Sequence, residues 1–397
     1  MQDRNLHIAR AHSRQSECAS HTQIEAWCRL LRDCRWSQKQ KYRLIKALES
    51  PEDILASDDR TLGEIAGRKA REDVKEVVAA DVHADLDWLA QPNNHLITLN
   101  STRFPKLLKQ LADPPVALFA SGNLALLDDP KVAVVGSRRP TPVGAKLVQQ
   151  LAADLAQLGL VVTSGMALGV DGLAHQAALA AQGPSIAVMG CGLDIVYPAR
   201  NRGLFQQLKE CGLILSEYPL GYKPTRFSFP QRNRIVSGLS HGVIIVEAAE
   251  RSGTLITARL ALDQDRELMV VPGSSLSAQY AGSHQLLKEG ATLVTSAQDV
   301  LHALEQSLQQ YLISNSKQRQ SISVQNSLGK MHSNNGIAEG NSQEHSLLQY
   351  IGADSTPINQ LICASGMPAN EVSALLLILE LDGLVSVDND GGVINLS

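Results

Sequence analysis

The chain has 397 residues, of which 44% are hydrophobic and 19% charged, and this composition excludes a globally disordered protein. At roughly 150 residues per domain, the length indicates two or three domains. No run of 18 apolar residues occurs and the first residues lack the apolar stretch of a secretory signal, so we expect neither a transmembrane helix nor secretion. The six cysteines form no C-x-x-C pair, which disfavours a zinc site or a disulfide scaffold and favours a cytoplasmic location.

The charge is divided unevenly along the chain. The net charge is −4, but residues 344–397 contain seven acids and no Lys or Arg, which leaves +3 for residues 1–343. Nucleic acid would be repelled by the acidic end and attracted to basic patches on the rest of the chain.

The N-terminal part divides into two segments. Residues 1–20 are polar and without pattern, so we expect a disordered extension. Residues 21–95 show helical periodicity in IEAWCRLLRDC and KYRLIKALES, and SPEDILAS begins with a Ser cap followed by Pro at the first helical position. We predict a small all-helical domain of the SAM or helix-hairpin-helix type.

Residues 96–305 follow a different pattern, in which short apolar runs alternate with amphipathic helices. The runs are KVAVVGS, LVVTSG, SIAVMGCG, LILSEYP, GVIIVEAA, LMVVPG and ATLVTS. Continuous apolar runs are typical of parallel strands buried on both faces. Because helices separate these runs, we predict an α/β domain with a doubly wound sheet.

The C-terminal part begins with residues 306–343, which are rich in Ser, Gln and Asn and predict a flexible linker. Residues 344–397 then show three short helical patterns and two short strands joined by the hairpin signal DNDGG. This order is typical of a winged helix, a fold that suggests DNA binding by analogy. Since this module has no cation for the phosphate backbone, we interpret it as a protein-contact domain or a vestige of a DNA binder. Its apolar run from Leu375 to Leu379 is either that contact or the module's own core.

Several predicted strands end in small or polar residues that suit an anion. They are the turn after the first core strand (Gly136, Ser137, Arg138, Arg139), the end of the second (Ser164, Gly165), the end of the third (Gly190, Cys191, Gly192) and the helix start that follows a fourth (Ser252, Gly253, Thr254). The carboxyl ends of parallel strands face one crevice, where ligands bind in this class of fold. A structural turn with solvated arginines is the alternative for each turn taken alone.

Three titratable residues near these turns are interpreted as structural. Asp171 and His175 follow the second strand, where capping and core packing explain them. Cys191 follows the third strand within GCG, and no neighbouring base activates it, so we expect an inert buried thiol.

The segment from Lys223 to Arg234 contains four basic residues, two aromatic residues and no acid. Cations that meet phosphates, interleaved with rings that stack on bases, are typical of single-stranded nucleic acid binding. The alternative is a surface loop whose Phe side chains seal the sheet edge. Because Pro230 restricts the preceding residue to extended backbone, we expect the Phe229 ring to point outward.

The motifs GSRRPTPVG, SGMALGVDGLAH, GCGLDIVYPARN, SEYPLGYKPTRFSFPQRNRIVSGLS, VVPGS and GSHQLLKEGA, in this order, resemble those of the DNA-processing protein A (DprA/Smf) family. The resemblance implies an extended Rossmann-like central domain and a homodimer that contacts through the region of His284 and Leu287. It also implies binding of single-stranded DNA and loading of RecA recombinase during natural transformation, with no membrane association, cofactor, metal or catalytic step. The predicted DNA-binding residues are Gly136, Ser137, Arg138, Arg139, Ser164, Gly165, Arg226, Phe229, Arg232, Asn233, Arg234, Ser252, Gly253 and Thr254.

Two other functions remain open at this point. Glu247 followed by Ser252-Gly253-Thr254 vaguely resembles the Gly-Gly-x-Gly-Thr-x-x-Glu region of phosphoribohydrolases, although the order is reversed and the paired glycines are missing. No nucleophile and base stand out together, so a nucleotide-binding enzyme is the second choice. A sensor that binds a free nucleotide in the same crevice is the third.

Overall fold

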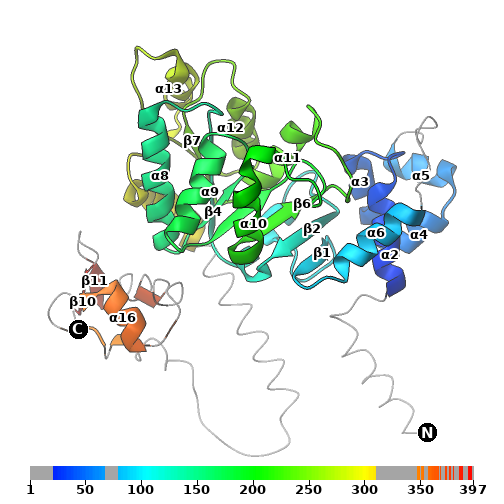
Figure 1. Cartoon of the computed structure of the whole chain (residues 1–397), viewed down its shortest axis with the longest axis horizontal. Coiled ribbons are helices and arrows are strands. Elements are labelled where there is room, and N and C mark those ends of the chain that lie inside the picture. Colours follow the sequence, from blue (N-terminus) through cyan, green and yellow to red (C-terminus); the bar gives the residue numbers. More distant parts are fainter. Residues whose placement is uncertain are drawn as a thin grey trace, which may run out of the picture. The chain divides into compact units, whose positions relative to one another are not determined.

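The computed structural model describes residues 21–67, 79–309 and parts of 347–395 (Figure 1). Residues 1–156 and 161–305 belong to one compact unit, and residues 306–397 with 157–160 belong to a second. The predicted extension 1–20 and residues 310–343 of the predicted linker lie outside the described residues. Residues 306–309, which we also assigned to the linker, are helical. Within the described part of the chain, no helix is long and apolar enough to cross a membrane.

The N-terminal domain is all-helical, as predicted. Its described helices are α2 (His21–Arg32), α3 (Gln38–Leu48), α4 (Pro51–Ala56), α5 (Asp59–Ala66) and α6 (Ala79–Leu89). The Ser50 hydroxyl accepts a hydrogen bond from the Asp53 amide at 3.1 Å, and Pro51 begins α4, so this helix starts where the sequence predicts. Trp27, Leu30 and Leu44 are buried in the core.

The central domain contains a nine-stranded sheet in the order β1-β2-β6-β5-β4-β3-β7-β8-β9. Its parallel strands are β3 (Lys131–Gly136), β4 (Val161–Ser164), β5 (Ser185–Val188), β6 (Leu213–Ser216), β7 (Gly242–Val246), β8 (Glu267–Val270) and β9 (Thr292–Leu293). Each of them lies in one of the seven apolar runs, apart from Glu267, which begins β8 one residue before its run. The strand order reverses between β3 and β7, and this switch point is where such sheets bind ligands at their carboxyl ends.

Two strands at one edge of the sheet were not predicted. β1 (Asn94–Thr98) and β2 (Ala117–Gly122) pair antiparallel with one another, and β2 pairs antiparallel with β6. The predicted domain boundary at 95/96 therefore falls inside β1. β2 is buried along its whole length, so the run VALFASG carried a strand signal that the sequence analysis did not use.

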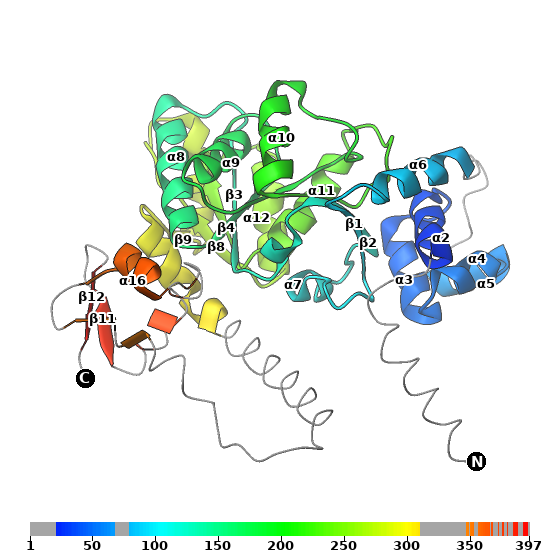
Figure 2. The ribbon, with the colours of Figure 1, turned by 60° about the horizontal axis from the view of Figure 1, so that its bottom comes forward.

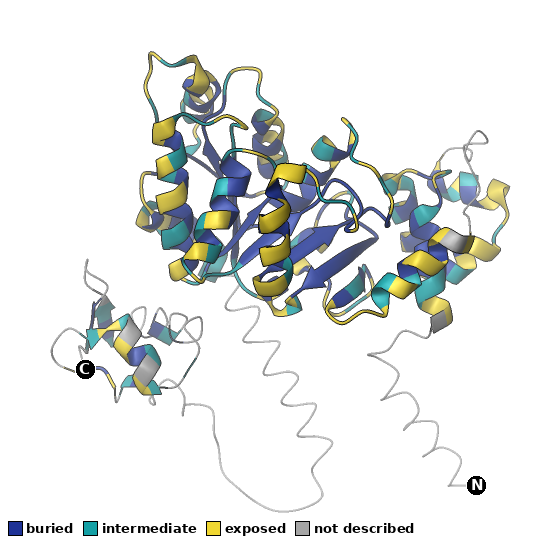
Figure 3. Cartoon of the chain, viewed as in Figure 1, coloured by how far each residue is buried: buried dark blue, intermediate teal, exposed yellow. Residues whose placement is uncertain are grey.

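Helices cover both faces of the sheet (Figure 2). One face carries α8 (Pro142–Gln157), α9 (Val170–Ala180) and α10 (Arg202–Cys211), and the other carries α11 (Ser228–Gly238) and α12 (Thr254–Asp263). The short helices α7 (Lys106–Lys109) and α13 (Ala281–Lys288) complete the domain. Strands β2 to β8 are largely buried and the outer sides of the helices are exposed (Figure 3), which confirms the doubly wound α/β fold.

The second unit contains a small antiparallel sheet in the order β10-β12-β11. Its described elements are β10 (Thr356–Pro357), α16 (Ile358–Ser365), β11 (Val385–Val387) and β12 (Gly392–Asn395). β11 and β12 form the predicted hairpin, with Ser386 opposite Ile394. Leu376 and Leu379 are buried in the core of this unit, and Leu375 packs against that core. The three described residues of the apolar run, Leu375, Leu376 and Leu379, therefore belong to the module's own core.

Candidate nucleic-acid interface

The turn that follows β3 lies against the end of β7. A side chain at Gly136 would place its Cβ 1.8 Å from the Val246 carbonyl oxygen, so only glycine allows this close approach. Beyond it the backbone amide of Ser137 donates to the same Val246 oxygen at 3.2 Å. Arg138 and Arg139 then extend from the surface, and both are exposed.

The start of α12 lies beside this turn, as the sequence predicts. The Thr254 hydroxyl donates to the Gly136 carbonyl oxygen at 3.1 Å and accepts from the Ser252 hydroxyl at 2.9 Å. The Ser252 hydroxyl oxygen also accepts from the Thr254 amide at 3.1 Å, whereas Gly253 is exposed. Both hydroxyls thus form hydrogen bonds within the protein, and these bonds connect the start of α12 to the turn after β3.

A hollow opens at the carboxyl ends of β3, β4 and β5. Residues from four segments line it, among them Arg138, Gly165, Gly190, Tyr197, Phe229 and Arg232. Ser164 lies buried beside Gly165, where its hydroxyl donates to the Val134 carbonyl oxygen at 2.6 Å. The predicted convergence therefore holds for three strand ends, whereas the residues from Ser252 to Thr254 do not line the hollow.

Arg232 is one of the buried residues of the hollow, with 5% of its surface exposed. Its Nη1 donates to the carbonyl oxygens of Gly165 and Val188, which follow β4 and end β5. A Cβ on Gly165 would lie 2.3 Å from that nitrogen. Arg232 therefore ties two strand ends together, and a DNA contact of its side chain stays a prediction.

Arg234, two residues further along α11, is also buried, but its partners are different. Its Nη2 forms an ion pair with the carboxylate of Glu217, whose side chain is 1% exposed, and its Nη1 donates to the Asp113 carbonyl oxygen at 2.8 Å. Burial raises the pKa of Glu217, and the charge of Arg234 opposes that rise. The guanidinium of Arg234 is thus buried and paired within the protein, and a DNA contact of this residue stays a prediction.

The first half of the basic segment has the opposite character. Lys223, Arg226 and Phe227 are all exposed, and the Phe227 ring is 64% exposed. The guanidinium carbon of Arg226 lies 4.7 Å from the centre of that ring, a cation–π distance. Phe227 was not among the predicted site residues, and its neighbour Arg226 was the signal that pointed to it.

Phe229 lies at the second position of α11, so its backbone is helical rather than extended as we expected. Pro230 fits the first turn of the helix because its missing N–H would have no helical partner there. The Phe229 ring is half-buried, 5.4 Å from the ring of Tyr197 and 5.9 Å from the guanidinium carbon of Arg138. The ring thus faces the hollow, and Tyr197, 45% exposed, is a site residue that the sequence analysis missed.

Asn233 is half-buried on α11, and its carbonyl oxygen accepts a hydrogen bond from the Ser237 hydroxyl at 3.1 Å. This contact is internal to the helix. A DNA contact of the Asn233 side chain stays a prediction.

The three titratable residues that we interpreted as structural are structural. The Asp171 carboxylate accepts from the amides of Gly165 and Ala167 at 3.2 and 3.3 Å. Burial lowers the pKa of His175 to about 3, and its ring nitrogen bonds the Ser185 hydroxyl at 2.8 Å. Burial likewise raises the pKa of the Cys191 thiol to about 11, so this cysteine is a poor nucleophile.

Glu247, the carboxylate on which an enzymatic role would depend, is enclosed. It is fully buried, and it accepts hydrogen bonds from the Thr141 amide and the Tyr280 hydroxyl, both at 2.8 Å. Thr141 immediately precedes α8, so Glu247 stabilises the start of that helix. Among the described residues, no group of three or more His, Cys, Asp or Glu is arranged to hold a metal ion.

The two predicted dimer residues lie on α13. The His284 ring nitrogen bonds the Gly273 carbonyl oxygen at 3.1 Å, and the ring stacks on Tyr280 with centroids 6.3 Å apart. Leu287 is half-buried against the core. Both side chains thus make contacts within the chain, and the dimer stays a prediction.

Residues 95–305 match the family model for DNA recombination-mediator protein A, and residues 333–391 match the model for the DprA winged helix domain. The chain belongs to the DNA recombination-mediator protein A family. The resemblance seen in the motifs is thereby confirmed, and it extends to the acidic C-terminal module.

Individual relatives agree with this family membership. The chain is 39% identical over 318 residues to Protein Smf of Escherichia coli K12, covering 79% of this chain and 80% of that protein. It is 48% identical over 202 residues to DNA processing protein DprA of Streptococcus pneumoniae R6, covering 51% of this chain and 71% of that protein. The X-ray structure of Streptococcus pneumoniae DprA superposes with a TM-score of 0.61 and 36% identity, covering 70% of this chain and 97% of that one.

Proposed function

We propose that the protein binds single-stranded DNA across the surface formed by Arg138, Arg139, Lys223, Arg226 and the rings beside them. The observation that carries this proposal is the position of Phe229, half-buried at the hollow with its ring near both the Tyr197 ring and the guanidinium of Arg138. A ring that stacks on a base, next to a cation that meets the adjoining phosphate, is the combination that single-stranded DNA requires. Arg226 over the exposed Phe227 supplies the same pair of groups a second time.

Membership in a recombination-mediator family supports a wider role. We propose that the protein acts in the cytoplasm as a homodimer that loads RecA recombinase on single-stranded DNA during natural transformation, and that it performs no catalytic step. The enclosed carboxylate of Glu247 supports the last point, because it is bonded to Thr141 and Tyr280 rather than directed at a substrate.

Gel shifts with an oligo-dT length series test the proposal against both alternatives. We expect affinity to rise with length until the surface is filled, with weak binding of mononucleotides and no turnover. Tight binding of a mononucleotide without length dependence would instead indicate a nucleotide sensor, and turnover of a nucleotide would indicate an enzyme. Light scattering of the same samples measures the dimer, and strand-exchange assays with RecA measure loading.

A further inference from the structure

The loop of residues 219–227, here called the basic loop, connects β6 with α11 and carries Lys223 and Arg226. Its first part is fixed from inside the central domain. The Asp194 carboxylate accepts from the Gly221 amide at 2.9 Å, and the Tyr222 carbonyl oxygen accepts from the Gly192 amide at 3.0 Å. The Tyr222 ring also stacks on Tyr218 with centroids 4.3 Å apart.

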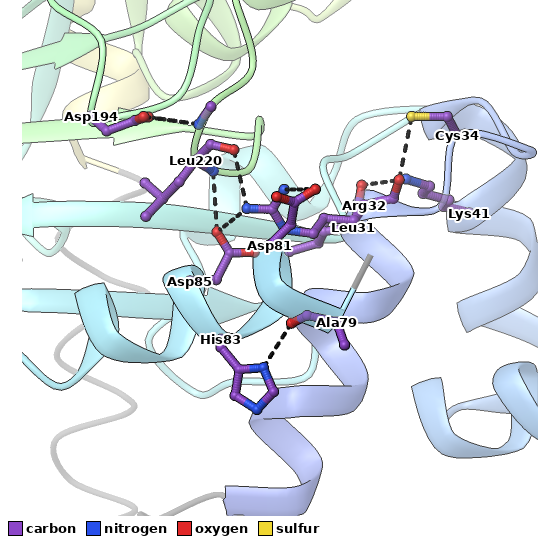
Figure 4. Close-up of polar contacts among 11 residues, drawn as sticks. Leu31, Arg32, Cys34, Lys41, Ala79, Asp81, His83, Asp85, Asp194 and Leu220 are labelled. Carbon is purple, nitrogen blue, oxygen red and sulfur yellow. Dashed lines mark hydrogen bonds and ion pairs between the residues drawn. The ribbon is translucent and has the colours of Figure 1, made fainter. Parts of the chain in front are cut away.

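The helical domain fixes the same loop from the other side (Figure 4). The Leu220 amide donates to Asp85 Oδ1 at 3.2 Å, and the Leu220 carbonyl oxygen accepts from Arg32 Nη2 at 3.1 Å. Both backbone polar groups of one loop residue are thus held by side chains of the N-terminal domain. The Leu220 side chain is itself buried, so this residue has little freedom.

The two side chains that hold Leu220 form an ion pair with each other. Arg32 of α2 donates through Nε to one oxygen of Asp85 of α6 at 2.5 Å and through Nη2 to the other at 2.7 Å. The side chains are 12% and 0% exposed. Two parallel hydrogen bonds fix the relative orientation of the pair as well as its distance, so the pair presents a rigid surface to Leu220.

A rigid start to the basic loop matters for a binding site made of long, mobile cations. Lys223 lies three residues after Leu220, and each residue adds up to about 3.5 Å of reach. Freedom at Leu220 would loosen Gly221 and Tyr222, the two residues that join it to Lys223, and would reach the cations through them. A loop that must be ordered upon binding loses affinity, because the ordering entropy opposes association.

We propose that Arg32 and Asp85 are positioning residues for DNA binding, through which the helical domain holds the basic loop in the shape that presents Lys223 and Arg226 to one strand. This inference rests on the proposed function. Neither residue contacts DNA itself, and their effect on affinity passes through Leu220.

The double variant Arg32→Met/Asp85→Leu tests this inference. Apolar residues of similar size often replace a buried ion pair without loss of stability, yet they offer no hydrogen bond to Leu220. The matched control is Arg29→Met/Glu25→Leu, which removes one cation and one anion from the exposed pair on the same helix. Circular dichroism verifies the fold of both variants. If the double variant does not fold, Asp85→Leu replaces it, because this change removes the acceptor of the Leu220 amide while Arg32 keeps Asp81 at 3.8 Å.

Hydrogen exchange of residues 219–227 and oligo-dT affinity are the two readouts. We expect faster exchange in the basic loop and about 3- to 10-fold weaker binding, the size of one net hydrogen bond, while the control matches the wild type. The effect should vanish in a Lys223→Ala/Arg226→Ala background, because there the loop has no cation left to position.

Two different failures are distinguishable. If Arg32→Met/Asp85→Leu, or the single variant in its place, binds oligo-dT as tightly as the control while Lys223→Ala/Arg226→Ala binds weakly, the positioning role is overturned and the binding surface stands. If Lys223→Ala/Arg226→Ala also binds like the wild type, the proposed binding surface itself is overturned.

Discussion

The two halves of the segment from Lys223 to Arg234 carry the same kinds of residue and have opposite surroundings. Arg226 is exposed and lies over the exposed ring of Phe227. Arg234, eight positions later, is buried against Glu217. The comparison teaches that a run of cations marks a binding surface only where nothing in the fold has already neutralised it.

The largest difference between the two halves should appear in stability. Replacing Arg234 by Ala leaves the Glu217 carboxylate buried without its partner, and we expect the free energy of unfolding to fall by about 3–5 kcal/mol. Replacing Arg226 by Ala should change it by no more than about 0.5 kcal/mol. Urea denaturation followed by circular dichroism measures both free energies. Equal losses in the two variants would contradict the difference in burial between Arg226 and Arg234.

The stability loss of Arg234→Ala should depend on pH. Burial raises the pKa of Glu217 in the folded protein and Arg234 opposes this rise, so removal of Arg234 raises that pKa further. A carboxyl group whose pKa is higher in the folded state than in the unfolded state binds its proton more tightly when the protein is folded. Lowering the pH therefore stabilises the folded state. The deficit relative to the wild type should therefore shrink between about pH 8 and about pH 5. A deficit that grows as the pH falls would contradict the assignment.

The two aromatic residues also differ in burial, because Phe227 is exposed and Phe229 is half-buried at the start of α11. Either ring, replaced by Ala, should cost about 1–3 kcal/mol of single-strand affinity if it stacks on a base, with the salt dependence unchanged. Only Phe229→Ala should also lower the melting temperature, because this ring packs on Tyr197. Loss of stability without loss of affinity would show that Phe229 only seals the hollow.

The exposed cations should show their effect in the salt dependence of binding. Each phosphate contact contributes about 0.7 to the slope of log K against log salt, so Lys223→Ala/Arg226→Ala should flatten it by about 1.4. From the same relation, affinity at about 0.1 M salt should fall by about 10- to 25-fold. An unchanged slope with weaker binding would mean that these residues act on something other than phosphate.

The acidic C-terminal module should have the smallest effect. It has seven acids and no cation, so removal of residues 344–397 should leave oligo-dT affinity unchanged or slightly raised, most visibly at low salt. Gel shifts of the full chain and the truncated chain across a salt series make this comparison. A marked drop in affinity in a folded truncated protein would make the module a DNA-binding part despite its charge.

The fold could be predicted from the sequence where burial is two-sided. The parallel strands β3 to β8 were found as apolar runs, because helices cover both faces of the sheet there. β1 escaped because its burial is only partial, and its partner β2 escaped because no helical pattern separates it from a second apolar run. The start of α11 was missed because Pro230 was taken to hold the preceding residue in extended backbone. In the first turn of a helix, proline is tolerated instead.

The site was predictable only in part, and the reason is distance along the chain. The exposed position of Arg138 follows from a local turn between a strand and a helix. The burial of Arg232 and Arg234 depends on Gly165, Val188 and Glu217, which precede them by 67, 44 and 17 positions. No local sequence pattern identifies partners so far away. The four cations of the segment therefore could not be divided into exposed and buried ones from the sequence.

The most direct test of the account is the salt dependence of oligo-dT binding by Arg138→Ala, compared with Arg60→Ala. Arg60 is 89% exposed on α5 of the helical domain, so its replacement changes the net charge equally without touching the hollow. We predict that Arg138→Ala binds more weakly and flattens the slope by about 0.7, while Arg60→Ala matches the wild type. If Arg138→Ala kept both the affinity and the slope of the wild type, single-stranded DNA would not bind at this surface.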